Sequence, residues 1–129
     1  MKGHCHCKAV RWESDGNIAW SCYCHCTDCR RNCAAPVTAF FGLPHESVTW
    51  SGDPPAVYRS SPDVERLFCA ACGTQMAYRN AGDTVNIHLY IATLENPETV
   101  SPRFHVFHTD HLPWLDIQDS LPRYAKTGN

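Results

Sequence analysis

Seven of the nine cysteines in this sequence of 129 residues stand in three short motifs, and cysteine thiolates bind metal ions. The motifs are Cys-His-Cys at 5–7, Cys-His-Cys-Thr-Asp-Cys at 24–29 and Cys-Ala-Ala-Cys-Gly at 69–73. Cys22 and Cys33 lie outside them. A closed tetrahedral zinc site takes four protein ligands, whereas a zinc that does chemistry usually has three and keeps one position open. The odd number of ligands therefore indicates an open site.

We expect these cysteines to bind metal rather than to form disulfide bonds. The N-terminal stretch MKGHCHCKAV has no apolar region of the kind found in secretory signals, and no stretch is long enough to span a membrane. The expected location is therefore the cytoplasm, where thiols stay reduced. In that compartment, closely spaced cysteines more often hold a metal or take part in catalysis.

The pair Cys69 and Cys72 is the most specific of the three motifs. Two cysteines at this spacing can hold one metal from a tight turn, and Gly73 suits the backbone of such a turn. A redox-active pair of the same spacing normally opens a helix in a thioredoxin-like unit. Here the pair stands between two predicted strands, which favours metal. Cys5 and Cys7 alternate along another predicted strand, so both sulfurs share one face.

The third motif offers three thiolates, from Cys24, Cys26 and Cys29. They can hold a metal and leave a fourth position for water or for a substrate thiol. The alternative is that Cys22, Cys33 or His25 fills that position and closes the site. Cys33 stands four residues after Cys29, which makes it the stronger of the two extra cysteines, whereas His25 points away from its neighbours if the strand continues.

Spacing leaves two ways to divide the motifs between sites. A hairpin turning at Asp15-Gly16 would place residues 5 and 7 opposite 26 and 24, and would build one four-cysteine site from these two motifs. Alternatively, the 5–7 motif joins the 69–72 pair. That arrangement closes a long loop, which a metal could stabilise. Periodicity does not choose between the two.

The elements that must position these motifs are predicted to be short strands. Apolar and polar residues alternate, Gly and Pro turns separate the segments, and no long pattern of period 3.6 is present. The predicted strands cover 4–12, 18–24, 37–44, 64–69, 74–79, 85–94 and 103–108, with two more in 48–61 around a Gly-Asp-Pro-Pro turn. Residues 27–36 predict a loop or a short helical turn. The fold class is therefore mainly β, and we expect Trp114, Leu121 and Tyr124 to pack on the body.

The overall composition is that of an ordinary globular protein. Apolar residues make up 43% and charged residues 19%, and the length suits a single domain over 1–129. The formal net charge of −2 and the pI near 6.4 lack the basic character of a nucleic-acid binder. We therefore expect neither nucleic acid nor a membrane as a partner.

Six fragments taken together resemble a known family: GHCHCKAVRW, CHCTDCRR, AAPVTAF, VYRSS, RLFCAACGTQM and DSLPRY. The resemblance, from Gly3 to about Tyr124, is to the glutathione-dependent formaldehyde-activating enzyme family, which also includes centromere protein V. It implies a β-tent fold, with two layers of antiparallel strands stapled by zinc. Ala34 and Val37 depart from the glycine and phenylalanine common in the family.

The resemblance also implies two zinc ions per chain. It matches a structural zinc to Cys5, Cys7, Cys69 and Cys72, and a catalytic zinc to Cys24, Cys26 and Cys29. Cys22 and Cys33 match no ligand of the family.

The implied activity is that of a carbon–sulfur lyase acting on a glutathione–aldehyde adduct such as S-hydroxymethylglutathione, with glutathione as co-substrate. A zinc with an open position can deprotonate a bound thiol near neutral pH, and the thiolate can attack formaldehyde. A ligand sulfur, Asp28 or water could supply the proton. Arg30 and Arg31 could bind a glutathione carboxylate or be solvated surface cations, and Arg59 is a weaker candidate.

A histidine series and two other function classes complete the alternatives. His105, His108 and His111 are spaced by three, but strand alternation would separate the first two rings, so we expect no shared metal site.

The second hypothesis for the function is a zinc-stapled binding or carrier module. The third is a thiol redox protein whose 24–29 cluster cycles to a disulfide. A monomer and a homodimer both fit the sequence.

Overall fold

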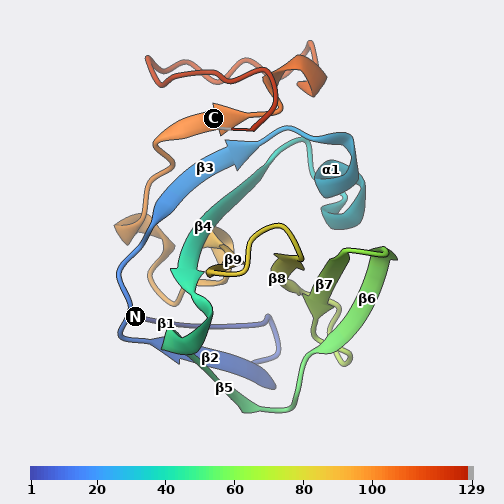
Figure 1. The fold of residues 1–129 in the computed structure, drawn as a ribbon, viewed down its shortest axis with the longest axis vertical. Helices are drawn as coiled ribbons and strands as arrows, with labels where there is room; N and C mark the ends of the chain where they lie inside the picture. The colour runs from blue at the N-terminus through green and yellow to red at the C-terminus, as the bar shows by residue number, and fades with distance from the viewer. Residues whose placement is uncertain (128–129) are drawn as a thin grey trace.

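Two β-sheets make up most of the structure, a computed structural model that describes residues 1–127 (Figure 1). The smaller sheet has the order β1 (Lys2–His4), β2 (Val10–Ser14) and β5 (Val48–Gly52). The larger sheet has the order β10 (Phe104–Val106), β3 (Trp20–Cys24), β4 (Thr38–Pro44), β9 (Asn86–Tyr90), β8 (Gln75–Asn80), β7 (Val64–Phe68) and β6 (Ala56–Ser61). The strand pairs are antiparallel apart from β10 with β3. The predicted mainly β class with two layers is confirmed.

Between residues 1 and 127, helical structure is limited to one short α-helix and four single turns. Helix α1 spans Thr27–Cys33, which agrees with the predicted loop or helical turn over 27–36. It ends at Ala34, whose φ of 51° is left-handed. The 3₁₀ turns are His45–Ser47, Ile91–Thr93, Pro97–Thr99 and His108–Asp110. Within residues 1–127, no helix reaches the length and apolar character needed to cross a membrane.

The main core lies where the small sheet packs on the large one. Trp12 on β2 is 1% exposed, and its ring centroid lies 6.0 Å from that of Phe41 on β4. Leu43, Met76 and Leu89 are fully buried in the same cluster. Burial of several large apolar side chains therefore holds the two sheets together.

The predicted continuous strand over 4–12 is wrong. Strand β1 ends at His4, and the chain turns back so that β2 pairs with β1, with Gly3 opposite Trp12. The turn is closed by the Cys5 amide, which donates to the Val10 carbonyl over 3.0 Å, and Lys8 adopts a left-handed φ of 66°. The alternation of residue types along 4–12 continues across this tight turn, so the sequence pattern did not reveal the turn.

The hairpin predicted at Asp15-Gly16 is also wrong. Strand β2 pairs with β1 and β5, whereas β3 pairs with β4 and β10, so Asp15-Gly16 joins the two sheets instead of turning within one. The Ser14 hydroxyl accepts from the Gly16 amide and donates to Ser47, both at 2.9 Å. Those side-chain contacts favour a path toward the other sheet over a two-residue turn.

The C-terminal segment lies along β10, which separates it from β3, on the side away from the small sheet (Figure 1). The His105 amide donates to the Pro122 carbonyl over 2.8 Å, and the Tyr124 amide donates to the His105 carbonyl over 2.9 Å. The prediction that Trp114 packs on the body is wrong, because its side chain is 71% exposed. Tyr124, at 37% exposed, packs edge-on against Phe104.

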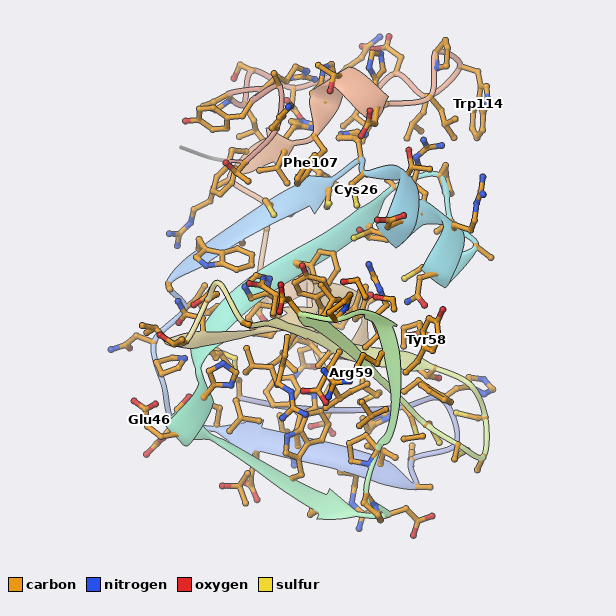
Figure 2. All side chains as sticks on the ribbon, turned by 45° about the vertical axis from the view of Figure 1, so that its right-hand side comes forward. Cys26, Glu46, Tyr58, Arg59, Phe107 and Trp114 are labelled. Atoms are coloured by element: carbon orange, nitrogen blue, oxygen red, sulfur yellow. The ribbon has the colours of Figure 1, made fainter. Side chains whose placement is uncertain are left out.

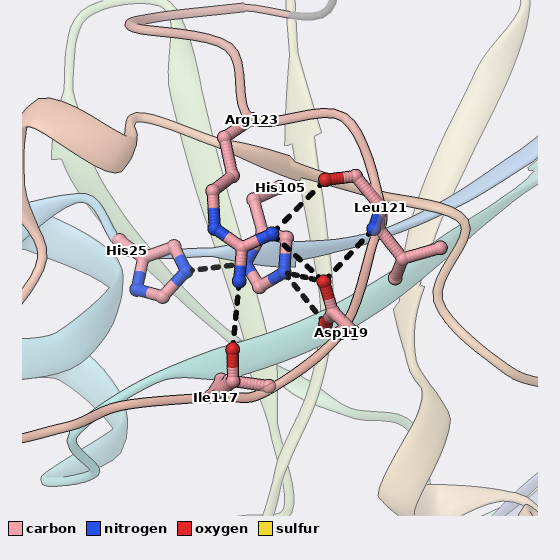
Figure 3. Close-up of polar contacts among 6 residues, drawn as sticks. All are labelled: His25, His105, Ile117, Asp119, Leu121 and Arg123. Carbon is pink, nitrogen blue, oxygen red and sulfur yellow. Dashed lines mark hydrogen bonds and ion pairs between the residues drawn. The ribbon is translucent and has the colours of Figure 1, made fainter.

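A chain of polar side chains connects this segment to the end of β3 (Figure 3). His105 is fully buried, and its Nδ1 lies 2.8 Å from Nε2 of His25. Its Nε2 lies 3.0 Å from Asp119 Oδ2, and Arg123 donates to Asp119 Oδ1 over 2.8 Å. Burial would raise the pKa of Asp119, but the hydrogen bonds from His105 and Arg123 outweigh it and lower that pKa to about 2. The carboxylate therefore stays charged and holds the segment in place.

Gly3 is a position where any side chain would collide with the core. A Cβ there would lie 2.5 Å from the Thr93 carbonyl oxygen and 2.7 Å from the Trp12 ring. We predict that Gly3→Ala lowers the free energy of unfolding by about 1–3 kcal/mol, because neither neighbour can move freely. Chemical denaturation measures this. Gly82→Ala is the control, because its Cβ would approach only the Asn80 side chain, at 3.0 Å, and a change within about 0.5 kcal/mol is expected. Equal losses for both variants would contradict the packing argument.

Asp119→Asn tests the polar chain. The loss of charge should loosen the C-terminal segment, so we predict roughly five-fold faster hydrogen exchange at the Tyr124 amide above pH 4. In the wild type this stabilisation is present above the ordinary carboxyl pKa of 3.8 and is lost as the pH falls toward about 2. Asp116→Asn is the matched control, because Asp116 is exposed and accepts only a long hydrogen bond of 3.4 Å from Gln118. Unchanged exchange in Asp119→Asn would refute the role.

Candidate metal centres

Two tight turns bring four cysteine sulfurs together. The sulfurs of Cys5, Cys7, Cys69 and Cys72 all lie within 4.8 Å of one another. The Sγ atoms of Cys5 and Cys7 are 3.6 Å apart, and those of Cys7 and Cys69 are 3.8 Å apart. Tetrahedral zinc with bonds of about 2.3 Å needs sulfurs at roughly this separation. This four-cysteine group could therefore hold a zinc ion.

The backbone of each turn supports the sulfurs. The Val10 amide donates to the sulfur of Cys5 over 3.3 Å, and the Cys72 amide donates to that of Cys69 over 3.4 Å. Gly73 adopts a φ of 82°, which a residue with a side chain rarely takes, and its amide closes the second turn on the Cys69 carbonyl at 2.8 Å.

The structure decides between the two ways of dividing the motifs. The 5–7 motif meets the 69–72 pair, as the family resemblance implies. The alternative that joined 5–7 to 24–26 is wrong, because β2 and β3 do not pair. The four-cysteine group thus links the turn between β1 and β2 to the turn between β7 and β8.

Three further sulfurs converge where β3 passes into α1. Cys24 ends β3, Cys26 is the N-cap of α1, and Cys29 lies in the first turn of the helix. Their sulfurs also lie within 4.8 Å of one another, and the Cys29 amide donates to the Cys26 sulfur over 3.2 Å. Asn32 donates to Gln75 over 3.0 Å and so fixes α1 against β8. A metal ion could bind to this three-cysteine group.

The electrostatics of the three-cysteine group favour a single thiolate, on Cys26. Hydrogen bonds from the Cys24 and Cys29 thiols lower the pKa of Cys26 to about 2, and the bond from the Cys29 amide adds to the effect. The pKa of Cys24 is raised by the hydrogen bonds of Cys24 to Cys26 and Cys29 and by burial. One thiolate is thus held at the N-cap of α1, where a cation would be needed to stabilise the other two.

Among residues 1–127, no fourth His, Cys, Asp or Glu ligand atom joins the three-cysteine group. The structure brings neither Cys22 nor Cys33 into it, although both pack nearby in the same apolar cluster. The ring of His25 turns toward His105 instead. One position beside the three sulfurs is therefore left without a protein ligand.

His105, His108 and His111 do not all lie on one strand, although the sequence predicted a strand over 103–108. Strand β10 ends at Val106, and Phe107 has a left-handed φ of 53°, so the chain turns back. The rings of His105 and His108 lie 5.8 Å apart, and those of His108 and His111 stack at 4.2 Å. The prediction that alternation separates these rings is wrong, because the strand ends between them.

The two arginines after the third motif line a groove of about 410 Å³. Its other lining residues are Thr27, Ala34, Ala35, Pro36, Leu112 and Trp114. Figure 2 shows Trp114 on the C-terminal segment above α1 and Cys26. Arg30 donates through Nε to the His25 carbonyl over 3.0 Å, whereas Arg31 is exposed. Arg31 is therefore the freer cation of the two.

The other predicted site residues lie at the surface. Asp28 is exposed in the first turn of α1, where a negative charge stabilises a helix. Arg59 is exposed on β6 and pairs with Glu65 at 3.3 Å. The structure thus accounts for both charges without a ligand.

Sequence reasoning missed two buried polar residues beside the three-cysteine group. Arg66 on β7 is 4% exposed, and its Nη1 lies 3.9 Å from the sulfur of Cys29. Tyr90 on β9 is 6% exposed, and its hydroxyl has no hydrogen-bond partner among the described residues. Burial raises the pKa of Tyr90, so the hydroxyl stays protonated. The sequence feature that could have indicated Arg66 is an arginine among the apolar residues of a short strand. A buried charge needs a partner, so such an arginine points to a nearby site.

Three comparisons with known proteins agree with one another. The family model for the glutathione-dependent formaldehyde-activating enzyme matches residues 1–110. An uncharacterized lyase of Schizosaccharomyces pombe is 33% identical over 92 residues, which are 70% of this chain. The match spans 66% of that protein, slightly less than two thirds of its length. A crystal structure of a Rhodobacter sphaeroides protein has a TM-score of 0.61 at 26% identity, over 80% of this chain and 93% of that one.

The family match includes all three cysteine motifs, since it extends past residue 73. The fold of the Rhodobacter sphaeroides protein agrees over most of both chains. The chain therefore belongs to the glutathione-dependent formaldehyde-activating enzyme family.

Proposed function

We propose that this protein is a zinc-dependent enzyme of the carbon–sulfur lyase type that acts on a glutathione–aldehyde adduct. The observation that carries the proposal is the three-cysteine group without a fourth protein ligand within residues 1–127. Three protein ligands and an open position are typical of zinc that does chemistry, and four ligands are typical of structural zinc. Membership of the family supports the same activity.

The two groups have separate roles in this proposal. The four-cysteine group holds a structural zinc, and Cys24, Cys26 and Cys29 hold the catalytic one. Zinc bound there would lower the pKa of a thiol at the open position and keep it as a thiolate. Adduct formation would join the thiol sulfur to the aldehyde carbon, with loss of the thiol proton and uptake of one proton by the carbonyl oxygen. Cleavage is the reverse reaction: it would break the carbon–sulfur bond and return the thiol and the aldehyde.

The groove beside α1 is suited to the rest of the glutathione molecule. Thr27, which lines the groove, stands between the ligands Cys26 and Cys29 in the chain. A substrate thiol at the metal would therefore carry its peptide part along the groove. Glutathione has two carboxylates, and the exposed guanidinium of Arg31 can bind one of them in a bidentate way. Arg30, already bonded to the His25 carbonyl, shapes the groove and adds positive charge.

Zinc content tests the two-centre proposal. Protein purified without chelator should hold about two zinc ions per chain, and Cys29→Ser should hold about one, because removal of a ligand empties only the open site. Cys33→Ser is the matched control, since it lies outside both groups and should keep about two. Elemental analysis measures this. A wild type with about one zinc and no loss in Cys29→Ser would show that the three-cysteine group is not a stable metal site.

Catalysis is tested separately, because the adduct also forms without a protein. The zinc-loaded wild type should speed cleavage of S-hydroxymethylglutathione above the uncatalysed rate, and Cys29→Ser should lose the acceleration. Tight binding of the adduct without acceleration would favour the carrier alternative. Loss of zinc on reversible oxidation would favour the redox alternative, for which the three closely spaced thiols are suited.

Arg31→Gln tests the groove. We predict roughly five-fold weaker binding of glutathione, because a charge-assisted hydrogen bond is lost near the surface. Binding of 2-mercaptoethanol, a thiol without carboxylates, should not change. Arg59→Gln removes an exposed arginine outside the groove and should leave both affinities at the wild-type value. If Arg31→Gln leaves glutathione affinity unchanged in calorimetric titration, the carboxylate assignment fails.

A further inference from the structure

Arg66 is a buried cation without a carboxylate partner among residues 1–127. Arg66 is 4% exposed, and no ion pair within these residues includes it. The neighbouring Glu65 turns toward Arg59 and Arg79 instead. An unpaired buried charge is costly, so the structure must supply a compensating negative charge. The thiolate charge of the three-cysteine group is that compensating charge, and the sulfur of Cys29 in this group lies 3.9 Å from Nη1.

The position of the guanidinium is fixed by its other contacts. Its Nε donates to the hydroxyl of Ser60 over 3.1 Å. Its central carbon lies 5.2 Å from the centroid of the Tyr78 ring, within the range of a cation–π contact. Tyr78 in turn packs with Phe40 and Tyr90 beside the three sulfurs. Arg66 is therefore held rigidly on the apolar side of the three-cysteine group.

The two cysteine groups differ in how their charge is screened. Cys7 and Cys72 of the four-cysteine group are exposed, so water can screen its thiolates. Cys24 and Cys29 are 6% and 5% exposed, so charge at the three-cysteine group is screened far less. A divalent ion with three thiolates has one net negative charge, and a fourth thiolate would add another. The fixed charge of Arg66 offsets this addition.

We propose that Arg66 is the counter-cation of the three-cysteine group and makes it select a thiolate as fourth ligand over a neutral ligand. The proposal rests on the proposed function of that group as an open metal site. Arg66 is a positioning residue in this role: it acts on the ligand through its charge and through Cys29. Removal of Arg66 should therefore weaken the binding of anionic ligands and leave the binding of neutral ligands unchanged.

The test uses the full chain loaded with Co²⁺, whose thiolate charge-transfer absorption reports the bound ligand without turnover. Wild type, Arg66→Gln and Arg66→Lys are each titrated with 2-mercaptoethanol and with imidazole. Cys29→Ser, loaded in the same way, gives the absorption of the four-cysteine group for subtraction. The small thiol has no carboxylate, so Arg30 and Arg31 do not affect the result. Arg59→Gln, with an exposed arginine on the adjacent strand, is the matched control.

We expect about ten-fold weaker thiol binding in Arg66→Gln, as for a lost hydrogen bond to a charged group, with imidazole affinity unchanged. Arg66→Lys keeps the charge and should keep most of the thiol affinity, and Arg59→Gln should match wild type. Equal thiol affinity in Arg66→Gln and wild type would overturn the proposal, as would a parallel loss for both ligands. Arg66→Met replaces Arg66→Gln if the latter does not fold. A wild type that binds cobalt but no thiol would instead refute the open-site function itself.

Discussion

Four sulfur atoms join two turns that lie more than sixty positions apart in the chain, and the arrangement of the whole molecule depends on that contact. The first turn belongs to the small sheet and the second to the large one, so the contact fixes one sheet on the other. Closing so long a loop has an entropic cost, which the binding free energy of a metal can offset. The cluster around Trp12 and Phe41 packs between the same two sheets and adds the burial of apolar side chains to this link.

The three-cysteine group depends less directly on the contact that fixes one sheet on the other. Its three cysteines come from one continuous stretch, but its surroundings include residues of β4, β7, β8, β9 and β10. Arg66 stands three residues before Cys69, a member of the four-cysteine group. The four-cysteine group thus lies at the end of the strand that carries the buried cation. In the proposed two-centre enzyme, loss of metal from the four-cysteine group would therefore alter the three-cysteine group, even though the two share no residue.

The sequence allowed the cysteine motifs, the mainly β class and a loop or short helical turn after Cys26 to be predicted, because these depend on local spacing and local turns. Strand partners were not local, so alternation along 4–12 concealed the turn at Lys8, and the hairpin at Asp15-Gly16 was wrong. The correct division of the motifs came only from the family resemblance. Arg66 was missed because its significance depends on a sulfur that lies 37 positions away in the chain.

One wall of the groove beside α1 comes from residues outside the family match. The match ends at residue 110, and Leu112 and Trp114 follow it. The opposite wall, from Thr27 to Pro36, is continuous in the chain with the three-cysteine group. The segment carrying Trp114 is held by the His105–Asp119 contact and by backbone pairing, with the indole itself free of the core. In the proposed enzyme, exchange of this second wall would therefore change which substrates fit the groove while leaving the three cysteines in place.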